Sequence, residues 1–255
     1  MEPVLLTATA DGVRTLTLNR PAARNALSSE LLERLVEVLH AAEDDGDVLA
    51  VVLTGTDPAF CAGLDLREAG TSGLPSSGVV DPKESVWWVL YGMNTPVIGA
   101  INGPAITGGL ELALQCTFLV ASERAVFGDT HARVGVHPGG GLSGLLPQAV
   151  GLRKAREMSL TGNFIDAAEA HRLGLVNHVV PHDELLPTAL RLAGDIAAGD
   201  PRTVAALHAT YRDVAERPLA DGLELERRRF QEWRYDPGEI EARRAAIAQR
   251  GRGQL

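Results

Sequence analysis

The sequence predicts an α/β domain followed by a purely helical C-terminal part. Up to Val180, short apolar runs typical of strands alternate with segments whose apolar residues recur at helical spacing. From Leu185 onward only helical segments follow, separated by turns rich in Gly, Asp and Pro. Alternating strands and helices form a sheet covered by helices. We therefore expect a core at residues 1–195 and a helical region at residues 196–255.

The first part of the chain predicts a hairpin and a helix. Val4–Thr9 and Val13–Leu18 are strand-like runs joined by Asp11-Gly12, which is a strong hairpin signal. Ser28 or Ser29 is a good N-cap for the helix that follows. The apolar residues at helical spacing in this helix are Leu31, Leu32, Leu35, Val36 and Leu39.

Three further strands and a short helix are expected in the middle of the chain. Leu49–Thr54, Pro96–Ile101 and Thr117–Ala121 are apolar runs, as in strands that are covered on both faces. Glu84–Met93 suits a short helix. Residues 68–81 are rich in Gly, Ser and Pro, and both a lid over a pocket and disorder remain open for this long connection.

The remaining elements are mostly helical. Gly128–Gly151 is rich in glycine and contains two histidines, and we assign no helix to it. A helix is expected at Leu152–Leu160, and another, capped by Asp166, ends at Leu173. The C-terminal helices are expected at residues 185–198, 202–216, 219–233 and 239–249.

The composition limits the compartment and the partners. The formal net charge of −9 disfavours nucleic acid and anionic membranes as partners. Cys61 and Cys116 are the two cysteines, too few for a disulfide framework. The N-terminus lacks a basic signal region, and no apolar run reaches the roughly 18 residues that a membrane span needs. We therefore expect a cytoplasmic protein.

The most informative stretch is Asn102–Cys116, which leads from a strand into an apolar helix. Thr107 is a suitable N-cap, and a glycine pair, Gly108 and Gly109, forms the first helical turn. Glycine costs about 1 kcal/mol against alanine in a helix, so the pair suggests close backbone approach to a ligand. Glu111 lies on nearly the same face as Gly108. Backbone donors and a carboxylate aimed at one point suit chemistry through an enolate, although glycine turns also open helices that bind nothing.

The order of several motifs closely resembles the crotonase, or enoyl-CoA hydratase/isomerase, family. The matching blocks are RPAARNAL (Arg20–Leu27), FCAGLDL (Phe60–Leu66), PVIGAINGPAITGGLELALQC (Pro96–Cys116), FGDTHARVGVHPGGG (Phe127–Gly141) and LTGNFIDAAEAHRLGLVNHVV (Leu160–Val180). The resemblance implies a crotonase-like spiral of ββα turns with a C-terminal helical trimerisation region. It also implies a homotrimer or a dimer of trimers.

The resemblance assigns roles to individual residues. The backbone N–H groups of Ala62 and Gly108 would form the oxyanion hole for a thioester oxygen, and Glu111 matches the first catalytic glutamate of the hydratases. The remaining assignments are coenzyme A contacts at Arg24, Ala62, Gly63, Leu64 and Asp65, and an acyl pocket lined by Trp87, Trp88 and His137. No metal and no separate cofactor are implied, because coenzyme A is part of the acyl-CoA substrate.

Two regions depart from the family pattern. The second catalytic glutamate of the hydratases is replaced by His131. An unperturbed imidazole titrates near ~6.5 and is able to exchange a proton at neutral pH, but His131 would also serve as a pocket wall. At the C-terminus, Ala246, Gln249 and Arg250 stand where family members often carry a Phe and a Lys-Arg pair that contact coenzyme A.

The resemblance implies an enzyme that hydrates 2-enoyl-CoA thioesters to 3-hydroxyacyl-CoA in fatty acid metabolism. Two alternatives remain open because of His131. One is a double-bond isomerase, which needs only one base to move a proton. The other is a non-catalytic acyl-CoA-binding protein that has kept the fold.

Overall fold

The computed structural model of the chain describes residues 2–74 and 84–253. It divides into two compact units, Met1–Ala206 and Leu207–Leu255. The boundary expected between residues 195 and 196 lies inside helix α9 (Leu185–Ala197), which packs on the central sheet. The compact core thus extends further along the chain than the sequence pattern indicated.

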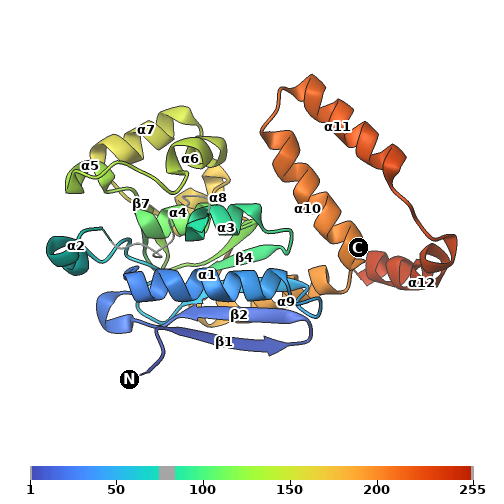
Figure 1. The fold of residues 1–255 in the computed structure, drawn as a ribbon, viewed down its shortest axis with the longest axis horizontal. Coiled ribbons are helices and arrows are strands. Elements are labelled where there is room, and N and C mark those ends of the chain that lie inside the picture. The colour runs from blue at the N-terminus through green and yellow to red at the C-terminus, as the bar shows by residue number, and fades with distance from the viewer. Residues whose placement is uncertain (1, 75–83, 254–255) are drawn as a thin grey trace. The chain divides into compact units, whose positions relative to one another are not determined.

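A six-stranded sheet forms the centre of the first unit, with the strand order β1-β2-β3-β4-β6-β9 (Figure 1). β1 (Leu5–Ala10) and β2 (Val13–Leu18) form the expected antiparallel hairpin. All later neighbours in this sheet run parallel, as expected for strands joined by helical crossovers. These strands are β3 (Ala50–Gly55), β4 (Val97–Ile101), β6 (Phe118–Ser122) and β9 (His178–Val180).

A small second sheet brings two distant loops together. It consists of β5 (Ala105–Ile106), β7 (Val126–Gly128) and β8 (Ile165–Asp166). β5 and β7 are parallel, with Ile106 opposite Gly128. The residues that follow these two strands, at the start of the glycine-pair helix and in the segment with His131, therefore leave the sheet side by side.

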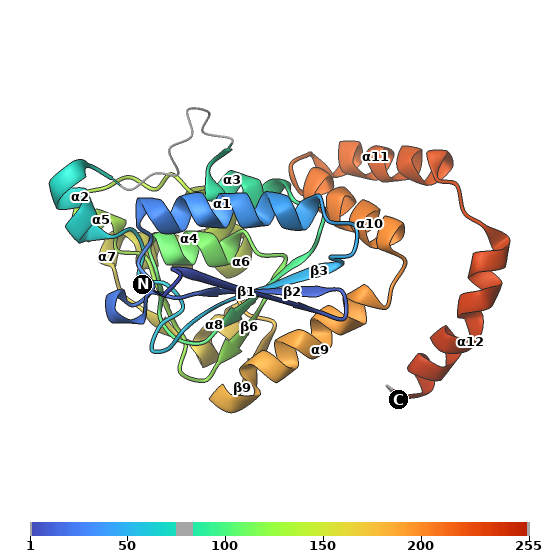
Figure 2. The ribbon, with the colours of Figure 1, turned by 60° about the horizontal axis from the view of Figure 1, so that its bottom comes forward.

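Helices cover both faces of the large sheet (Figure 2). On one face α9 packs against a cluster of small and branched side chains, namely Val13, Ala50, Val52, Ile98, Ala100 and Val120. The opposite face carries the larger core beneath α1 (Ser29–Glu43), α3 (Val86–Gly92) and α4 (Gly108–Leu114). β3 is buried along its whole length, which confirms the prediction of a strand covered on both faces.

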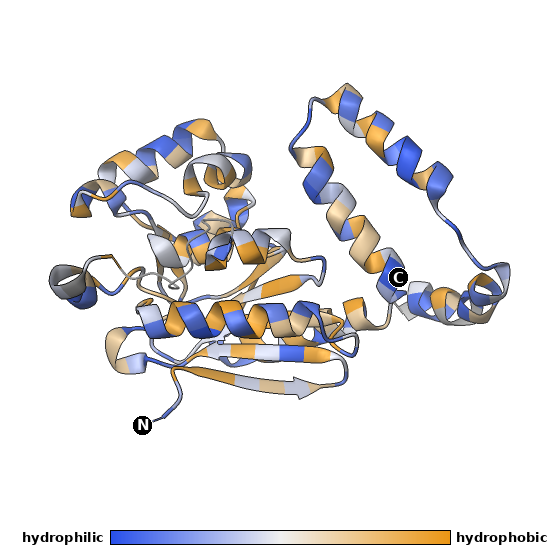
Figure 3. Cartoon of the chain, viewed as in Figure 1, coloured by the Kyte–Doolittle hydropathy of each residue, from blue (hydrophilic) through white to orange (hydrophobic). Residues whose placement is uncertain are grey.

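Helix α1 shows how local signals fix an element. Ser28, and not Ser29, is its N-cap, and the Ser28 hydroxyl accepts the N–H of Leu31 at 3.3 Å. Hydrophobic and hydrophilic residues alternate along the helix (Figure 3), so one stripe faces the core. The buried residues of this stripe are Leu31, Leu32, Leu35, Val38, Leu39 and Ala42. Fully burying one such aliphatic side chain stabilises the fold by about 1.5–3 kcal/mol.

The glycine-rich segment contains two helices that the sequence did not indicate, α5 (His131–Val134) and α6 (Leu142–Val150). Gly141, with φ of 95°, occupies the position before α6, so the glycine run forms the turn into this helix. Helices α7 (Leu152–Thr161) and α8 (Ala167–Leu173) agree with their predicted positions, and Asp166 caps α8 by accepting the N–H of Glu169.

The connection at residues 68–81 is described only in part. Its first residues belong to α2 (Leu66–Ser72), while residues 75–83 lie outside the described residues. The choice between a lid and disorder therefore stays open. Two short 3₁₀ turns, η1 (Pro21–Ala23) and η3 (His182–Glu184), complete the connections of the first unit.

The second unit is helical, as predicted. It holds the end of α10 (Pro201–Ala215), α11 (Leu219–Glu232) and α12 (Pro237–Gly253). The guanidinium of Arg229 on α11 donates to Thr210 at 2.9 Å and pairs with Asp213. Large apolar side chains stay exposed on α11 and α12, namely Leu219, Leu223, Phe230, Ile240 and Ile247.

Within residues 2–74 and 84–253, no helix combines the length and the apolar character needed to cross a membrane. The cytoplasmic location stays a prediction.

Candidate acid–base site

The glycine-pair helix begins at a strained residue. Thr107 has φ of 55° and ψ of −111°, a backbone conformation that costs a non-glycine residue about 1–3 kcal/mol. Its hydroxyl makes no capping bond to α4 within the described chain, because it accepts the N–H of Thr130 at 3.0 Å. Thr107 therefore stands at the predicted N-cap position, but its side chain does not cap the helix. The first N–H groups of α4 are left without the side-chain acceptor that a capped helix would provide.

A turn at Gly63 brings a second backbone donor beside this helix start. Gly63 has φ of 93°, and a Cβ there would lie 3.0 Å from the Ile106 carbonyl oxygen, so the turn requires glycine. The position of a Cβ on Gly108 is 3.5 Å from the backbone nitrogen of Leu64. The N–H groups of Leu64 and Gly108 have no acceptor in the described part of the chain. Together they form a candidate anion hole.

This geometry differs from the pairing that the motif suggested. The N–H of Ala62 is donated to the carbonyl oxygen of Arg24 at 3.1 Å, so it is already occupied. Leu64, expected only as a coenzyme A contact, supplies the free donor next to Gly108. The motif order does not show which N–H group is free, because this depends on the backbone angles of the turn, where Gly63 has φ of 93°.

Glu111 lies one turn into α4 and is buried, with 3% of its surface exposed. Its Oε1 accepts the N–H of Gly140 at 2.7 Å. Burial raises the pKa of Glu111, and the Gly140 N–H and the nearby His131 oppose this effect without cancelling it. A buried carboxyl group whose pKa is raised is suited to taking and returning a proton near neutral pH.

The loop that carries Gly140 is held on two sides. The side-chain amide of Gln115, one turn beyond Glu111 on α4, donates to the Gly140 carbonyl oxygen at 2.6 Å. The ring of Trp87 lies where a Cβ on Gly140 would stand, with its Cγ at 2.7 Å from that position. Trp87 Nε1 also donates to the Gly108 carbonyl oxygen at 3.5 Å. Trp87 therefore packs against the backbone of Gly108 and Gly140.

His131 is brought opposite Glu111 by the small sheet. The imidazole is buried, with its Nε2 at 3.8 Å from Glu111 Oε2. Its Nδ1 lies 2.7 Å from Oδ1 of Asp129, which is also buried. The predicted pair of Glu111 and His131 thus shares one buried site, and Asp129 adds a third titratable group behind the imidazole.

Two residues expected in an acyl pocket lie at the surface. Trp88 is 48% exposed, and its ring meets Tyr91 edge-on at 5.9 Å between centroids. His137 is exposed, and its Nδ1 is 2.9 Å from the carbonyl oxygen of Pro138. Of the three residues assigned to the acyl pocket, only Trp87 contacts residues of the site, namely Gly108 and Gly140. Adjacent tryptophans on a helix point about 100° apart, which explains why Trp87 and Trp88 separate.

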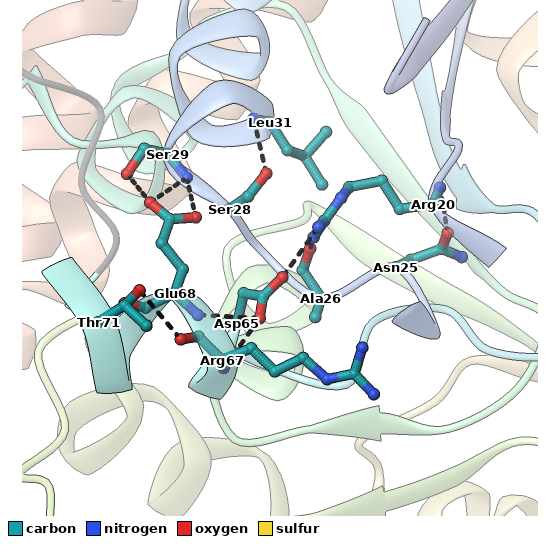
Figure 4. A network of polar contacts seen from close by, with 10 residues as sticks. All are labelled: Arg20, Asn25, Ala26, Ser28, Ser29, Leu31, Asp65, Arg67, Glu68 and Thr71. Atoms are coloured by element: carbon teal, nitrogen blue, oxygen red, sulfur yellow. Dashed lines mark hydrogen bonds and ion pairs between the residues drawn. The ribbon is translucent and has the colours of Figure 1, made fainter. Parts of the chain in front are cut away.

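Asp65, one of the expected coenzyme A residues, belongs to a network of polar contacts (Figure 4). Asp65 accepts the guanidinium of Arg20 at 2.9 Å and caps α2 through the N–H groups of Arg67 and Glu68. Burial acts to raise the pKa of Asp65, but Arg20 and the capping donors outweigh it and hold the pKa low. The Asp65 carboxylate is therefore occupied by these contacts, which stabilise the turn at residues 62–65. Arg24, by contrast, is exposed.

The RPAARNAL motif also fastens the turn at residues 56–59. Asn25 adopts φ of 56° and is fully buried. Its side-chain amide donates to the carbonyl oxygens of Thr56 and Ala59, both at 2.7 Å. The position of Cys61 is thereby fixed beside β5. Burial raises the pKa of both thiols, Cys61 and Cys116, to about 12, so they stay protonated.

Three positions that support the site, Arg20, Gln115 and Gly140, were not singled out from the sequence. Gln115 lies four residues after Glu111, a spacing that places both side chains on one helix face and that would have indicated a shared partner. For Gly140 the glycine run itself was the signal, but its partner Glu111 is far away in the chain. Arg20 belongs to a recognised motif, although its partner Asp65 belongs to a different one.

Comparisons with known proteins identify the family. A family model described as enoyl-CoA hydratase/isomerase matches residues 8–237. A probable enoyl-CoA hydratase of Rhizobium meliloti is 42% identical over 248 residues, covering 96% of this chain and 95% of the relative. The structure of an enoyl-CoA hydratase from Mycobacterium tuberculosis H37Rv matches with a TM-score of 0.76 at 53% identity, covering 88% of this chain and 95% of that one.

One similar structure belongs to a protein with a different activity. The monofunctional enoyl CoA isomerase of M. smegmatis matches with a TM-score of 0.75 at 32% identity, covering 87% of this chain and 98% of that chain. The family model and the relatives together span most of the sequence, including the glycine-pair helix and the His131 segment. The chain belongs to the enoyl-CoA hydratase/isomerase family.

Proposed function

We propose that this protein hydrates 2-enoyl-CoA thioesters to 3-hydroxyacyl-CoA. The observation that carries the proposal is the buried pair of Glu111 on α4 and His131 at the start of α5, 3.8 Å apart, next to two free backbone donors. Hydration of a conjugated thioester needs this combination, because one group must take a proton, another must return one, and the oxygen must hold negative charge between the two steps.

The residues divide these tasks. The N–H groups of Leu64 and Gly108 bind the thioester oxygen and stabilise the enolate; removing one such donor in other enzymes costs ~2.7–4 kcal/mol. Water adds its oxygen to C3 while the Glu111 carboxylate takes the proton it loses. The electron pair of the double bond moves to the thioester oxygen. When the enolate collapses, C2 receives a proton from Nε2 of the protonated His131 imidazole, and the atoms of one water molecule are added.

The acyl-CoA ligand and the assembly belong to the same proposal. Arg24 is an exposed cation at the rim of the Gly63 turn, so it is available to the anionic part of coenzyme A. Coenzyme A enters as part of the substrate, and no separate cofactor takes part in these steps. We place the reaction in fatty acid metabolism. The exposed apolar residues of α11 and α12 support a trimer or a dimer of trimers.

A direct assay tests the activity. Crotonyl-CoA and longer 2-enoyl-CoA thioesters lose their conjugated absorbance when they are hydrated, and mass spectrometry of the product should show the gain of one water. Glu111→Gln should still bind the thioester but turn it over about 10²–10⁴-fold more slowly, the usual contribution of general acid–base catalysis. An unchanged kcat in folded Glu111→Gln would contradict the assignment.

Double-bond isomerisation is the second candidate function. It is supported by the similarity to the M. smegmatis isomerase and by the single glutamate in the site. An isomerase would convert a 3-enoyl-CoA to a 2-enoyl-CoA, so the conjugated absorbance would appear instead of disappearing. Binding of both substrates with neither change would favour the non-catalytic acyl-CoA-binding alternative.

A further inference from the structure

Asp129 is a buried charge that the reaction steps above do not use. It is 0% exposed and directly follows β7, two residues before His131, the first residue of the short helix α5. Burial acts to raise its pKa, but the His131 imidazole, the nearby Ser159 side chain and the His131 backbone N–H outweigh burial, so the pKa is lowered. Asp129 is therefore a carboxylate at neutral pH.

Oδ1 of Asp129 has two contacts at hydrogen-bond distance, and both involve His131. Oδ1 accepts the backbone N–H of His131 at 3.1 Å and lies 2.7 Å from His131 Nδ1. Within the described chain, Oδ2 has no partner at hydrogen-bond distance. A carboxylate only accepts hydrogen bonds, so the short contact requires that Nδ1 carries the proton. The other ring nitrogen, Nε2, faces Glu111.

We propose that Asp129 is a positioning residue that holds the Nδ1 proton of His131 in every step, so that Nε2 is the only imidazole atom that exchanges protons with water and substrate. This inference rests on the proposed function for the identity of the reaction. It goes beyond that function by replacing the second carboxylate of the site with an Asp–His pair. A carboxylate that fixes the imidazole tautomer and stabilises the imidazolium acts in the same way in other acid–base sites.

The competing explanation is that Asp129 only supports the start of α5. The backbone contact to His131 is compatible with such a role, since aspartate often accepts an N–H two residues further on. The two explanations differ in one respect. A structural role needs the acceptor oxygen, which asparagine retains, whereas the positioning role needs the negative charge beside Nδ1.

The first test is spectroscopic and needs no substrate. In protein labelled with ¹⁵N-histidine, the ring signals of His131 are found among those of the seven histidines by comparison with His131→Gln. The neutral imidazole of His131 should carry its proton on Nδ1 in the wild type. A neutral form protonated on Nε2 would overturn the proposal even if the enzyme is an active hydratase. This measurement on the wild type stays decisive if Asp129 variants fail to fold.

The second test is a double-mutant cycle on turnover. Asp129→Asn should lower kcat by at least about 10-fold and by no more than the ~10²–10⁴-fold expected for losing the imidazole itself. In the His131→Gln background the same substitution should have no further effect, because Asp129 acts through the imidazole. An unchanged kcat in Asp129→Asn would show that the acceptor oxygen alone is needed and would overturn the proposal. Equal losses in both backgrounds would overturn it too, because Asp129 would then act without the imidazole.

A matched control separates charge loss at the site from charge loss elsewhere. Asp166→Asn removes a carboxylate that also accepts one backbone N–H, from Glu169 at 2.8 Å, but Asp166 is exposed at the start of α8. It should leave kcat and the His131 ring signals unchanged. If the wild type shows neither hydration nor isomerisation, the proposed function fails, and the ring signals alone still decide the role of Asp129.

Discussion

At the scale of single residues, Glu111 should make the protein less stable where it is ionised. Its pKa is raised in the folded protein by burial, so the folded state holds this proton more tightly than the unfolded chain does. As pH rises from about 4.5, the ordinary value for Glu, toward the folded-state pKa, the wild type should therefore lose stability. Glu111→Gln cannot ionise and keeps an acceptor for the Gly140 N–H.

The measurement is the free energy of unfolding of wild type and Glu111→Gln across pH. The stability advantage of the variant should grow as pH rises through this window and then level off. A difference that is flat with pH, or that favours the wild type at neutral pH, would show that the pKa of Glu111 is not raised.

Gly108 tests the anion hole at one backbone position. The Cβ position on Gly108 has its nearest neighbours at 3.5 Å, an ordinary contact, so Gly108→Ala should fold with an almost unchanged Tm. The methyl group would stand beside the N–H of Leu64, where the thioester oxygen must approach. We expect kcat to fall by about 10²–10³-fold, as after loss of an oxyanion donor. Wild-type kinetics in a folded variant would place the thioester elsewhere.

His131 and Asp129 also predict how a second glutamate would behave. His131→Glu by itself would put a carboxyl group between ionised Asp129 and Glu111, where like charges disfavour one another. Its hydratase activity should be lower than that of the double variant Asp129→Asn, His131→Glu, which has one carboxylate fewer. The comparison is kcat for crotonyl-CoA in both proteins. Equal activities would show that Asp129 carries no charge in the site.

At the scale of elements, the sequence predicted those whose signals are local. Asp11-Gly12 indicated the β1–β2 hairpin, and Ser28 and Asp166 indicated where α1 and α8 begin. Helix α6 was not predicted because its start follows a glycine run, and glycine is about 1 kcal/mol less favourable than alanine in a helix. Gly140 and Glu111 are far apart in the chain, so the local sequence pattern does not indicate their contact.

The difference between local signals and contacts over long sequence distances also explains which parts of the site the sequence predicted. The motif order led to Glu111 and His131, which the structure brings within 3.8 Å of each other. It did not show which of the N–H groups in the turn at residues 62–64 is free, because that depends on the direction of each peptide group. Ala62 is occupied by the Arg24 carbonyl, a partner far away in the chain.

The loop between α5 and α6 provides a test with a matched pair of glycines. A Cβ on Gly140 would lie 2.7 Å from the Trp87 ring, whereas a Cβ on Gly139 would have nothing within 4 Å. Gly140→Ala should push the loop away from Glu111 and cost about 1–3 kcal/mol of stability, as other overpacked positions do. Gly139→Ala should stay within about 0.5 kcal/mol of the wild type, as surface changes usually do.

Turnover gives the functional part of this comparison. Loss of the Gly140 N–H removes a donor to Glu111 and should raise the pH at which activity appears on the acid side, because the donor lowers the pKa of Glu111. Gly139→Ala should keep the wild-type pH–rate profile. If both variants behave alike, the loop does not position the carboxyl group.

At the scale of the whole molecule, the apolar residues on α11 and α12 call for a partner surface. Phe230 is 80% exposed on α11, and Leu219 and Leu223 on the same helix are 74% and 57% exposed. Leu219, Leu223 and Phe230 recur at helical spacing along α11, and an exposed apolar helix face is typical of a protein–protein contact. A homotrimer or a dimer of trimers is the assembly that we predict for these helices, and the sedimentation coefficient of the purified chain measures it.

Phe230→Glu tests whether this surface makes the contact. The substitution removes apolar area and places a charge in the interface, so it should shift the sedimenting species toward smaller assemblies at the same protein concentration. Gln231→Glu is the matched control, because it adds the same charge at the neighbouring exposed position of α11 without removing apolar area. A wild type that sediments as a monomer would contradict the predicted assembly. Equal shifts in both variants would show that charge on α11, and not burial of Phe230, governs association.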